Sequence, residues 1–408
     1  MLSVRDAEAT ILNAVQGFDN QKDIEFVDLL TANDRILATS ITSHLDFPHW
    51  DNSAMDGFAV RYADVQQARA EKPTVLEVVA EIPAGCQPQV TIKPGQAARI
   101  FTGAVMPVGA DTVVMQEKTH RQENRVSIFA APQPQEFVRN KGDFYKAGSE
   151  LLPAGIRLTA SEIAVLAAAG RDQISIFRRP RVAIFSSGNE LVMPGEPLQP
   201  GQIVDSNQFA LATLMRELGA EVLLLGIVKD DPAALKEIIE YAIANSDIVI
   251  SSGGVSVGDY DYIEKILQSL GAKIHFRAVQ MRPGKPLTFA TFPNTLYFGL
   301  PGNPVSALVT CWRFVQPTIK KLAGLAQGWQ GQFLKVRSHS ELQSNGKMET
   351  YIWGKLHLVN GVYEFYKAGG NNSSGNLINL AQTNALAVLP VGKTLVYPRE
   401  EVLVLQVR

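Results

Sequence analysis

The stretch Ile250-Ser-Ser-Gly-Gly-Val-Ser-Val-Gly-Asp259 is the most informative part of this chain. It continues the apolar run Asp247-Ile-Val-Ile250, and a helical pattern begins near Tyr262. Glycines let the backbone approach a ligand closely, and free N–H groups with serine hydroxyls are suited to phosphate oxygens. Carboxylates directly after such a loop can hold a hard metal ion against those phosphates. The segment therefore predicts a site for a phosphorylated small molecule at the end of a strand.

The composition is typical of a globular protein with several domains. The chain has 408 residues, of which 46% are hydrophobic and 19% charged, and this length predicts two to four domains. The formal net charge of -2 provides no general positive field, so we expect neither nucleic acid nor a membrane as a partner. Cys86 and Cys311 lie far apart and form no ligand pattern, which predicts two free buried thiols and favours a reduced, cytoplasmic setting.

A mostly parallel sheet is predicted between residues 177 and 326. Strand and helix patterns alternate there, and short buried strands joined by helices are typical of a parallel sheet with helices on both faces. The strand candidates are 181–185, 222–228, 248–250, 273–276 and 296–299, and the helix candidates are 206–218, 232–244, 262–270 and 304–322. The segment is therefore expected to form a three-layer α/β substrate domain.

The remaining segments predict three further domains around this one. Strand-like runs separated by proline and glycine indicate a β-rich insertion domain at 46–146. Helical patterns at 2–17, 34–40 and 159–170 indicate a discontinuous helical linker domain, formed by residues 1–45 and 147–176. Short strands return in the tail and predict a small β barrel or sandwich at 327–408. The expected fold class is therefore multidomain α/β with a C-terminal small β barrel.

Three of the predicted strands end in loops of small polar residues, at 185–190, 251–261 and 299–306. Ligands of open parallel sheets bind beyond the carboxyl ends of the strands. A single glycine-rich turn is more often only a tight connection, but three at one edge favour a phosphate site. Asn303 and Pro304 are typical of the start of a helix, whose N-terminus would face the ligand.

Acidic residues fall on or next to the same edge of the sheet. They are Glu190, Asp230, Asp231, Asp259 and Asp261. No cysteine and no close histidine pair accompanies them, so the pattern favours Mg²⁺ over zinc. For Glu190 and Asp261 we favour a functional role, because each follows a glycine loop by about one turn. Helix capping explains the acids before Pro232 at least as well as a ligand role.

The segment Met281-Arg-Pro-Gly-Lys-Pro286 offers two cations across a rigid turn. Arg282 could bind an oxyanion with two hydrogen bonds, and Lys285 could supply a point charge. The alternative is two solvated surface cations. Ser373-Ser374-Gly375-Asn376 could be another oxyanion loop, although an ordinary polar turn explains it as well. Asp51-Asn-Ser-Ala-Met-Asp-Gly57 is, by itself, typical of a structural turn.

Together these motifs resemble the molybdopterin molybdenumtransferase family, the bacterial molybdenum-insertion enzymes related to the E domain of gephyrin. The resemblance depends on Asp51-Asn-Ser-Ala-Met-Asp-Gly57, Arg99-Ile-Phe-Thr-Gly-Ala104, Ser251-Ser-Gly-Gly-Val-Ser-Val-Gly258 with Asp261, Arg282-Pro-Gly-Lys-Pro286 and Leu300-Pro-Gly-Asn-Pro-Val-Ser306. It covers nearly the whole chain in order. The Ser-Gly-Gly-Val-Ser loop alone would also fit molybdopterin adenylyltransferases, but the first motif and the C-terminal β domain favour the insertion enzyme.

The resemblance implies a Mg²⁺-dependent transferase that acts in molybdenum cofactor biosynthesis. It implies that molybdenum from molybdate enters adenylylated molybdopterin and that AMP leaves. It also implies a homodimer with the active cleft at the subunit interface, and contacts with other molybdenum cofactor biosynthesis proteins. The alternatives are an enzyme like the adenylyltransferases and a non-catalytic scaffold like gephyrin.

The loops and the resemblance together predict the site residues. The catalytic residues are expected to be Asp56, Thr102, Glu190, Asp231, Asp261 and Lys285. Glu190 and Asp261 are also expected to bind the metal. The substrate-binding residues are expected to be Ser251, Gly253, Gly254, Ser256, Arg282, Pro301, Gly302, Asn303, Pro304 and Ser374.

Two positions depart from the family pattern. The family commonly has Gly-Glu-Asp after a basic stretch, but here Lys141-Gly142-Asp143 is followed by Phe144. In the tail the family often has arginine directly before a strand glycine, where this chain has Trp353-Gly354. Tryptophan carries no charge, so we expect weaker molybdate binding unless Lys347 or Lys355 takes over the role of the arginine.

Overall fold

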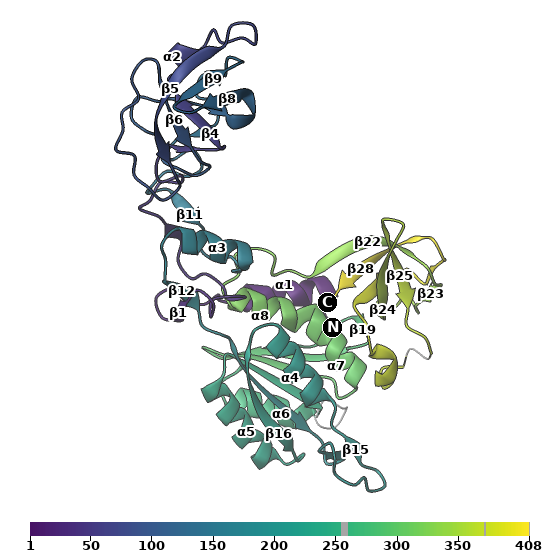
Figure 1. Ribbon diagram of the computed structural model, residues 1–408. Coiled ribbons are helices and arrows are strands. Elements are labelled where there is room, and N and C mark those ends of the chain that lie inside the picture. The colour runs from purple at the N-terminus through teal and green to yellow at the C-terminus, as the bar shows by residue number, and fades with distance from the viewer. Residues whose placement is uncertain (254–259, 371–372, 408) are drawn as a thin grey trace. The chain divides into compact units, whose positions relative to one another are not determined.

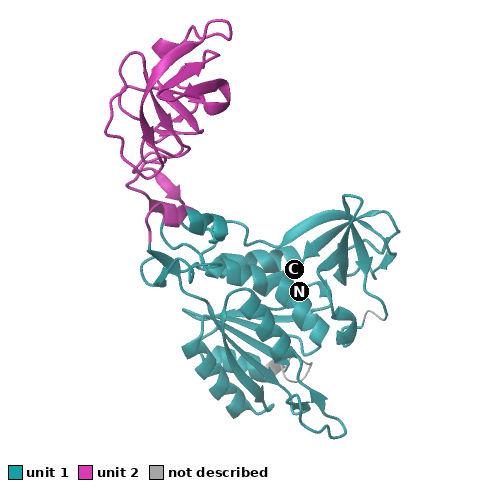
Figure 2. Ribbon diagram, in the orientation of Figure 1, with its two compact units in different colours: residues 1–39, 154–164, 172–408 teal, residues 40–153, 165–171 magenta. Residues whose placement is uncertain are grey.

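The computed structural model describes residues 1–253, 260–370 and 373–407, and the chain divides into two compact units (Figure 2). Unit 1 comprises residues 1–39, 154–164 and 172–408, and unit 2 comprises residues 40–153 and 165–171. Gly254 and Ser256 lie outside the described residues, and so does the side chain of Asp261. Within the described part of the chain, no helix has the length and apolar character needed to cross a membrane.

The main sheet of unit 1 is mostly parallel, as the sequence predicts. Its strand order is β16-β13-β17-β21-β20-β18. The first four strands run parallel to their neighbours, while β20 is antiparallel to both β21 and β18. The strands are β13 (Arg181–Ser187), β16 (Glu221–Val228), β17 (Ile248–Gly253), β18 (Lys273–Ala278), β20 (Pro286–Thr291) and β21 (Leu296–Leu300). Strand β20 is not among the predicted strands.

Helices cover both faces of this sheet (Figure 1). In β13, Val182 and Ile184 pack with α4 and α7 in one core cluster, and Ala183 and Phe185 pack with α5 and α6 in another. Alternate residues of a strand point to opposite faces, so the two clusters form the two interfaces of a three-layer domain. The helices are α4 (Asn207–Glu217), α5 (Pro232–Asn245), α6 (Tyr260–Ser269), α7 (Pro304–Thr310) and α8 (Gln316–Leu322).

The long helix predicted at 304–322 is interrupted. A π-helical segment, Cys311–Val315, separates α7 from α8, and Pro317 lies at the start of α8. Proline has no N–H to donate to the preceding turn, which accounts for a local change in helical hydrogen bonding. Cys311 is buried and Cys86 is exposed, both as free thiols, so the predicted burial is wrong for Cys86.

A closed five-stranded barrel forms the C-terminal part of unit 1, which confirms the predicted β barrel. The strands follow the order β24-β25-β22-β28-β26, and β26 pairs back to β24. Their bounds are β22 (Gln332–Ser338), β24 (Glu349–Val359), β25 (Val362–Lys367), β26 (Ala385–Leu389) and β28 (Glu401–Gln406), with the short pair β23 (Leu342–Gln343) and β27 (Leu395–Val396) beside them. The short strand β19 (Met281–Arg282) pairs with β24, so the turn with the two cations is attached to the barrel.

The rest of unit 1 contains α1 (Val4–Ala14), the antiparallel pair β1 (Ile24–Asp28) and β12 (Gln173–Phe177), and the parallel pair β14 (Leu191–Val192) and β15 (Ile203–Val204). Helix α3 (Ala160–Ala168) has residues in both units. The helix predicted at 34–40 is wrong. Ile36 and Leu37 instead form β-bridges with Arg157 and Ile176, and Leu37 is fully buried.

Unit 2 is β-rich, which confirms the predicted insertion domain as a β structure. Its six-stranded sheet has the order β7-β4-β6-β5-β9-β8, and two apolar clusters pack around it. Its elements are β2 (Ile41–Thr42), β3 (Asn52–Ser53), β4 (Gly57–Val60), α2 (Tyr62–Val65), β5 (Thr74–Ile82), β6 (Gln96–Ile100), β7 (Thr112–Met115), β8 (Thr119–Gln122), β9 (Arg125–Ile128), β10 (Val138–Arg139) and β11 (Glu150–Leu152).

A buried ion pair connects the N-terminal helix to the core of unit 1. Arg313, in the π-helical segment, is only 6% exposed. Its two terminal nitrogens donate to the carboxylate of Glu8 in α1, one of them at 2.7 Å. Its Nε donates to the hydroxyl of Tyr351 in β24 at 2.9 Å. One guanidinium group therefore joins α1, the π-helical segment and the barrel.

We expect Glu8→Ala to reduce the free energy of unfolding by about 3 kcal/mol, because it leaves a buried guanidinium group without its counter-charge. Urea denaturation would measure the change. Glu240→Ala is the matched control, since Glu240 forms an exposed pair with Lys236 at 3.8 Å and should cost about 0.5 kcal/mol or less. Equal losses for the two variants would contradict the role given to Arg313.

Candidate functional site

Three polar loops begin at the same edge of the main sheet. In the parallel register, Ser187 at the end of β13 lies opposite Gly253 at the end of β17. Ser252 lies opposite Leu300 at the end of β21. The carboxyl ends of three neighbouring strands therefore meet, which is where open parallel sheets bind ligands. This arrangement agrees with the expectation from the sequence.

The backbone around Gly253 requires glycine. Its φ is 91°, and a Cβ there would lie 2.2 Å from the carbonyl oxygen of Ser187. A Cβ on Gly302 would lie 3.5 Å from the Cα of Gly253. The ends of β13 and β17 and the loop after β21 therefore come into close backbone contact at positions where glycine has no side chain.

The predicted substrate-binding residue Ser251 is fully buried. Its hydroxyl forms a 2.6 Å hydrogen bond with the hydroxyl of Tyr297 in β21. Burial raises the pKa of Tyr297 to about 12, so this phenol stays protonated at neutral pH. At the end of β13, by contrast, the buried hydroxyls of Ser186 and Ser187 have no hydrogen-bond partner among the described residues.

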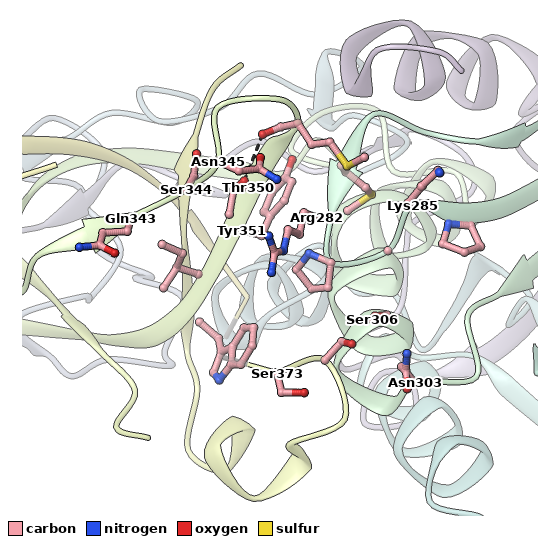
Figure 3. A pocket seen from close by; sticks show the side chains of 18 residues that line it. Arg282, Lys285, Asn303, Ser306, Gln343, Ser344, Asn345, Thr350, Tyr351 and Ser373 are labelled. Atoms are coloured by element: carbon pink, nitrogen blue, oxygen red, sulfur yellow. Dashed lines mark hydrogen bonds between the residues drawn. The ribbon is translucent and has the colours of Figure 1, made fainter. Parts of the chain in front are cut away.

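A cavity of about 580 Å³ lies beside these loops, and it brings together Arg282, Lys285, Asn303 and Ser374. In Figure 3 the barrel contributes Thr350, Tyr351 and Ser373, the α/β domain contributes Lys285, Asn303 and Ser306, and Arg282 lies between the two groups. Arg282 belongs to β19, and the register places it opposite Thr350 of β24.

Both cations of this cavity are exposed and unpaired. Neither Arg282 nor Lys285 forms a side-chain hydrogen bond or ion pair with another described residue. No carboxylate is among the described residues that line the cavity. Two unpaired cations in a cavity with hydroxyl and amide groups suit a small oxyanion, because each ionised hydrogen bond is stronger than a neutral one.

The wall on the barrel side contains Trp353, the residue that departs from the family pattern. Trp353 is 2% exposed, and its indole N–H has no hydrogen-bond partner among the described residues. Nearby, the carbonyl oxygen of Ser374 accepts a 3.2 Å hydrogen bond from the N–H of Val305 at the start of α7. Part of the N-terminus of α7 is therefore bound to the barrel segment. Pro301 and Gly302 belong to the loop before α7, and Pro304 is the first residue of α7.

The predicted acids differ in what their side chains do. Glu190 is exposed, and its carboxylate forms no hydrogen bond or ion pair with another described residue. Asp231 is the N-cap of α5, where its carboxylate accepts from the N–H of Ala234 at 2.8 Å. No group of three or more acidic, histidine or cysteine side chains among the described residues is arranged to hold a metal ion.

Asp56 and Thr102 belong to unit 2 and contact each other directly. The carboxylate of Asp56 accepts from the backbone N–H of Thr102 at 2.8 Å and from its hydroxyl at 2.7 Å. These two hydrogen bonds lower the pKa of Asp56 by stabilising its ionised form. Asp56 is thus held as a carboxylate in a defined orientation.

Several residues around these loops were not predicted. They are Asn207, which bonds Ser252 in β17 and Gly302 in the loop after β21, and Thr350, Tyr351 and Gln343, which line the cavity. The last three belong to the C-terminal part of unit 1, far along the chain from the glycine loops. Neither β23, which contains Gln343, nor β24, which contains the other two, was recognised as a strand, so no sequence signal placed these residues at the site.

A mostly parallel sheet with polar loops at one edge, a cavity lined by two cations and an attached small barrel define a multidomain α/β protein. Three family models match the chain. They are the MoeA N-terminal region (domain I and II) over residues 2–170, the probable molybdopterin binding domain over residues 183–321, and the MoeA C-terminal region (domain IV) over residues 335–407.

Relatives match along most or all of the chain. A molybdopterin molybdenumtransferase of Nostoc sp. is 67% identical over 100% of this chain and 94% of the relative. One of Haemophilus influenzae is 38% identical over 80% of this chain and 79% of the relative. The crystal structure of the molybdopterin biosynthesis MoeA protein from Pyrococcus horikoshii OT3 has a TM-score of 0.85 at 28% identity and covers 100% of both chains.

The chain belongs to the molybdopterin molybdenumtransferase (MoeA) family. This confirms the resemblance seen in the sequence motifs. The named relatives are molybdopterin molybdenumtransferases, and the one of Nostoc sp. aligns with the whole of this chain. The alternatives, an enzyme like the adenylyltransferases and a non-catalytic scaffold, are therefore not favoured.

We expect Thr102→Val to raise the pKa of Asp56, because the hydroxyl bond to the carboxylate is lost while the backbone bond can remain. A pH titration of the Asp56 carboxyl carbon by NMR would measure the shift, with Asp56→Asn to assign the signal. Thr102→Ser keeps a hydroxyl and should titrate like the wild type. A Thr102→Val titration that matches the wild type would show that the hydroxyl has no effect.

Proposed function

We propose that this protein transfers molybdenum from molybdate to adenylylated molybdopterin and that AMP is released. The observation that supports it most is the cavity beside the glycine loops, where Arg282 and Lys285 form no ion pair with another described residue. Molybdate is a compact dianion, and a cation pair with hydroxyl donors can bind it. Adenylylated molybdopterin carries phosphate groups, which suit exposed backbone N–H groups at the ends of parallel strands.

The proposal assigns the two substrates to neighbouring places. The adenylate lies along the loops that contain Ser251, Gly253, Gly254 and Ser256, and along the second loop with Pro301, Gly302, Asn303 and Pro304. Molybdate lies in the cavity, between Arg282 and Lys285 on one side and Ser374 on the other. Ser251 acts through its backbone, because its hydroxyl is bonded to Tyr297. The indole of Trp353 contributes no charge to the cavity.

We propose Mg²⁺ as the cofactor. Mg²⁺ is commonly held by one or two carboxylates together with substrate phosphates and waters, so a site needs few acids from the protein. The free, exposed carboxylate of Glu190 fits this donor set, and Asp261 is the second ligand in the proposal. When bound, the ion would screen the charge of the pyrophosphate as its bond is broken. Asp231 caps α5 through its hydrogen bond with the N–H of Ala234. In the proposal it keeps the start of this helix at the carboxyl edge of the main sheet.

Asp56 and Thr102 act on the same substrates in the proposal, from a homodimer whose active cleft lies at the subunit interface. The two hydrogen bonds from Thr102 support this role, because they hold the carboxylate of Asp56 in a defined orientation. The division into a linker domain (1–45 and 147–176), an insertion domain (46–146), an α/β domain (177–326) and a barrel domain (327–408) is part of the same proposal. So are contacts with other molybdenum cofactor biosynthesis proteins and a cytoplasmic location.

The purified protein with Mg²⁺, adenylylated molybdopterin and molybdate should release AMP, and it should do so only when molybdate is present. Chromatography of the nucleotide products would measure the release. Reactions without molybdate, and reactions with ATP and molybdopterin in place of the adenylate, are the controls. Release that does not depend on molybdate would contradict the proposal, and adenylylation from ATP would support the adenylyltransferase alternative.

Lys285→Ala should raise the KM for molybdate by about 10- to 100-fold, as expected for the loss of one charged interaction of about 1.5–3 kcal/mol. The Kd of the adenylate should change much less, because the proposal places Lys285 against molybdate and the adenylate along the glycine loops. Lys273→Ala removes an exposed lysine that does not line the cavity and should leave both constants unchanged. Equal losses in molybdate and adenylate binding for Lys285→Ala would refute the separation of the two places.

A further inference from the structure

The indole N–H of Trp353 is a buried hydrogen-bond donor without a partner. Trp353 is 2% exposed and lines the cavity of about 580 Å³. Its Nε1 has no hydrogen-bond partner among the described residues. Buried polar groups in proteins are nearly always hydrogen-bonded, because an unpaired one costs free energy. An unpaired donor in the lining of a cavity therefore indicates a ligand that accepts from it.

The side chain of Trp353 points out of the barrel. Ile352 belongs to an apolar cluster formed by barrel residues alone, whereas Tyr351 and Trp353 belong to the core cluster shared with the α/β domain. Alternate residues of a strand point to opposite faces, so β24 presents these two aromatic rings toward the α/β domain. Both rings line the cavity on its barrel side, and Lys285 and Asn303 line it on the α/β side (Figure 3).

The two aromatic residues differ in what their polar atoms do. The hydroxyl of Tyr351 accepts from Nε of Arg313 at 2.9 Å and donates to the carboxylate of Glu349 at 2.5 Å. Its donor is therefore already used within the protein. The donor of Trp353 is not, so it remains for a ligand of the cavity.

The two lysines considered from the sequence as donors at this place do not line the cavity. Neither Lys347 nor Lys355 is among the described residues of its lining. Lys355 instead donates from Nζ to the side-chain carbonyl of Gln382. The donor that β24 offers to the cavity is therefore the neutral indole.

The donors of the cavity define the chemistry of the ligand. An indole N–H, a guanidinium group and an ammonium group all donate hydrogen bonds and accept none. Trp353, Arg282 and Lys285 bring these three groups to one cavity. A tetrahedral oxyanion without bound protons offers an acceptor oxygen to each of them, and hydrogen bonds to an ionised acceptor are the stronger ones.

We propose that Trp353 is a substrate-binding and specificity-determining residue, and that its indole N–H donates to an oxygen of the oxyanion held in the cavity. The inference rests on the proposed function, in which this oxyanion is molybdate. Arg282 and Lys285 supply the charge, and Trp353 supplies a neutral donor in a fixed direction. The fixed direction follows from the packing of the indole in the shared core.

The indole N–H signals in a ¹H–¹⁵N NMR spectrum of the full-length protein test the contact directly. The chain has four tryptophans, so this region of the spectrum holds few signals, and Trp353→Phe assigns the one of interest. Sodium molybdate should move the Trp353 indole proton downfield, as expected for a new hydrogen bond to an anion. Sodium chloride at equal ionic strength is the control and should leave the signal in place.

Trp353→Phe also tests the strength of the contact, because it removes the N–H and keeps an aromatic ring in the wall. We expect the Kd for molybdate, measured by calorimetry without the adenylate, to rise by about tenfold or more for the loss of one hydrogen bond to an ionised group. Trp312→Phe is the matched control. Trp312 is 6% exposed and belongs to the same core cluster, but it does not line the cavity. Both variants should lower the melting temperature, and molybdate binding should weaken in Trp353→Phe alone.

The inference is overturned if molybdate leaves the Trp353 indole signal unmoved, or if Trp353→Phe binds molybdate like the wild type. It is also overturned if Trp312→Phe weakens molybdate binding to the same extent, because a general loss of packing would then explain the result. A wild-type protein that shows the indole shift but releases no AMP would refute the proposed function and support the oxyanion contact. Molybdate-dependent AMP release with an unmoved indole signal would support the function and refute the contact.

Discussion

The central position of β17 in the main sheet is the constraint on which the rest of the structure depends. Because β17 lies between β13 and β21 and runs parallel to both, the carboxyl ends of all three strands must lie at one edge. Helices bury these strands on both faces. A shift in register would move apolar residues out of the buried interfaces, so the register is fixed. Every loop that follows these strands therefore begins at the same place, and the polar groups of separate segments can act on one ligand.

A second set of contacts brings the barrel to this edge. The pairing of β19 with β24 carries Arg282 to the barrel, and the N–H of Val305 bonds the carbonyl of Ser374 at the start of α7. Arg313, in the π-helical segment after α7, pairs with Glu8 of α1 and donates to the hydroxyl of Tyr351 in β24. It therefore connects α1 and the barrel to this helical segment. The cavity is thus formed by residues of two folds that share one apolar core. No carboxylate is among the described residues that line the cavity, and Arg282 and Lys285 form no ion pair with another described residue.

Much of the fold could be predicted because buried strands and amphipathic helices have local signatures. The strands at 181–187, 248–253 and 296–300 and their covering helices follow from such patterns. The helix predicted at 34–40 failed because Leu37 is paired with Ile176, a partner that no local pattern contains. Strand β24 was missed since part of its length is buried on both faces and part is half exposed, so no regular alternation marks it. The contacts of Asn207 were missed because its partners Ser252 and Gly302 are far away in the sequence.

The sequence by itself determined the chemistry available at the site, namely glycine loops, acids and a pair of cations at strand ends. The sequence determines these groups because residue type sets their chemistry. Their short spacings along the chain are kept in the local structure. Only the tertiary structure decided how each group is used. It buried the hydroxyl of Ser251 against Tyr297, left Arg282 and Lys285 without an ion-pair partner among the described residues, and placed the amide of Asn207 between β17 and the loop after β21. Hydrogen bonds and burial depend on which segments pack together, and that follows from the sheet order and the shared core.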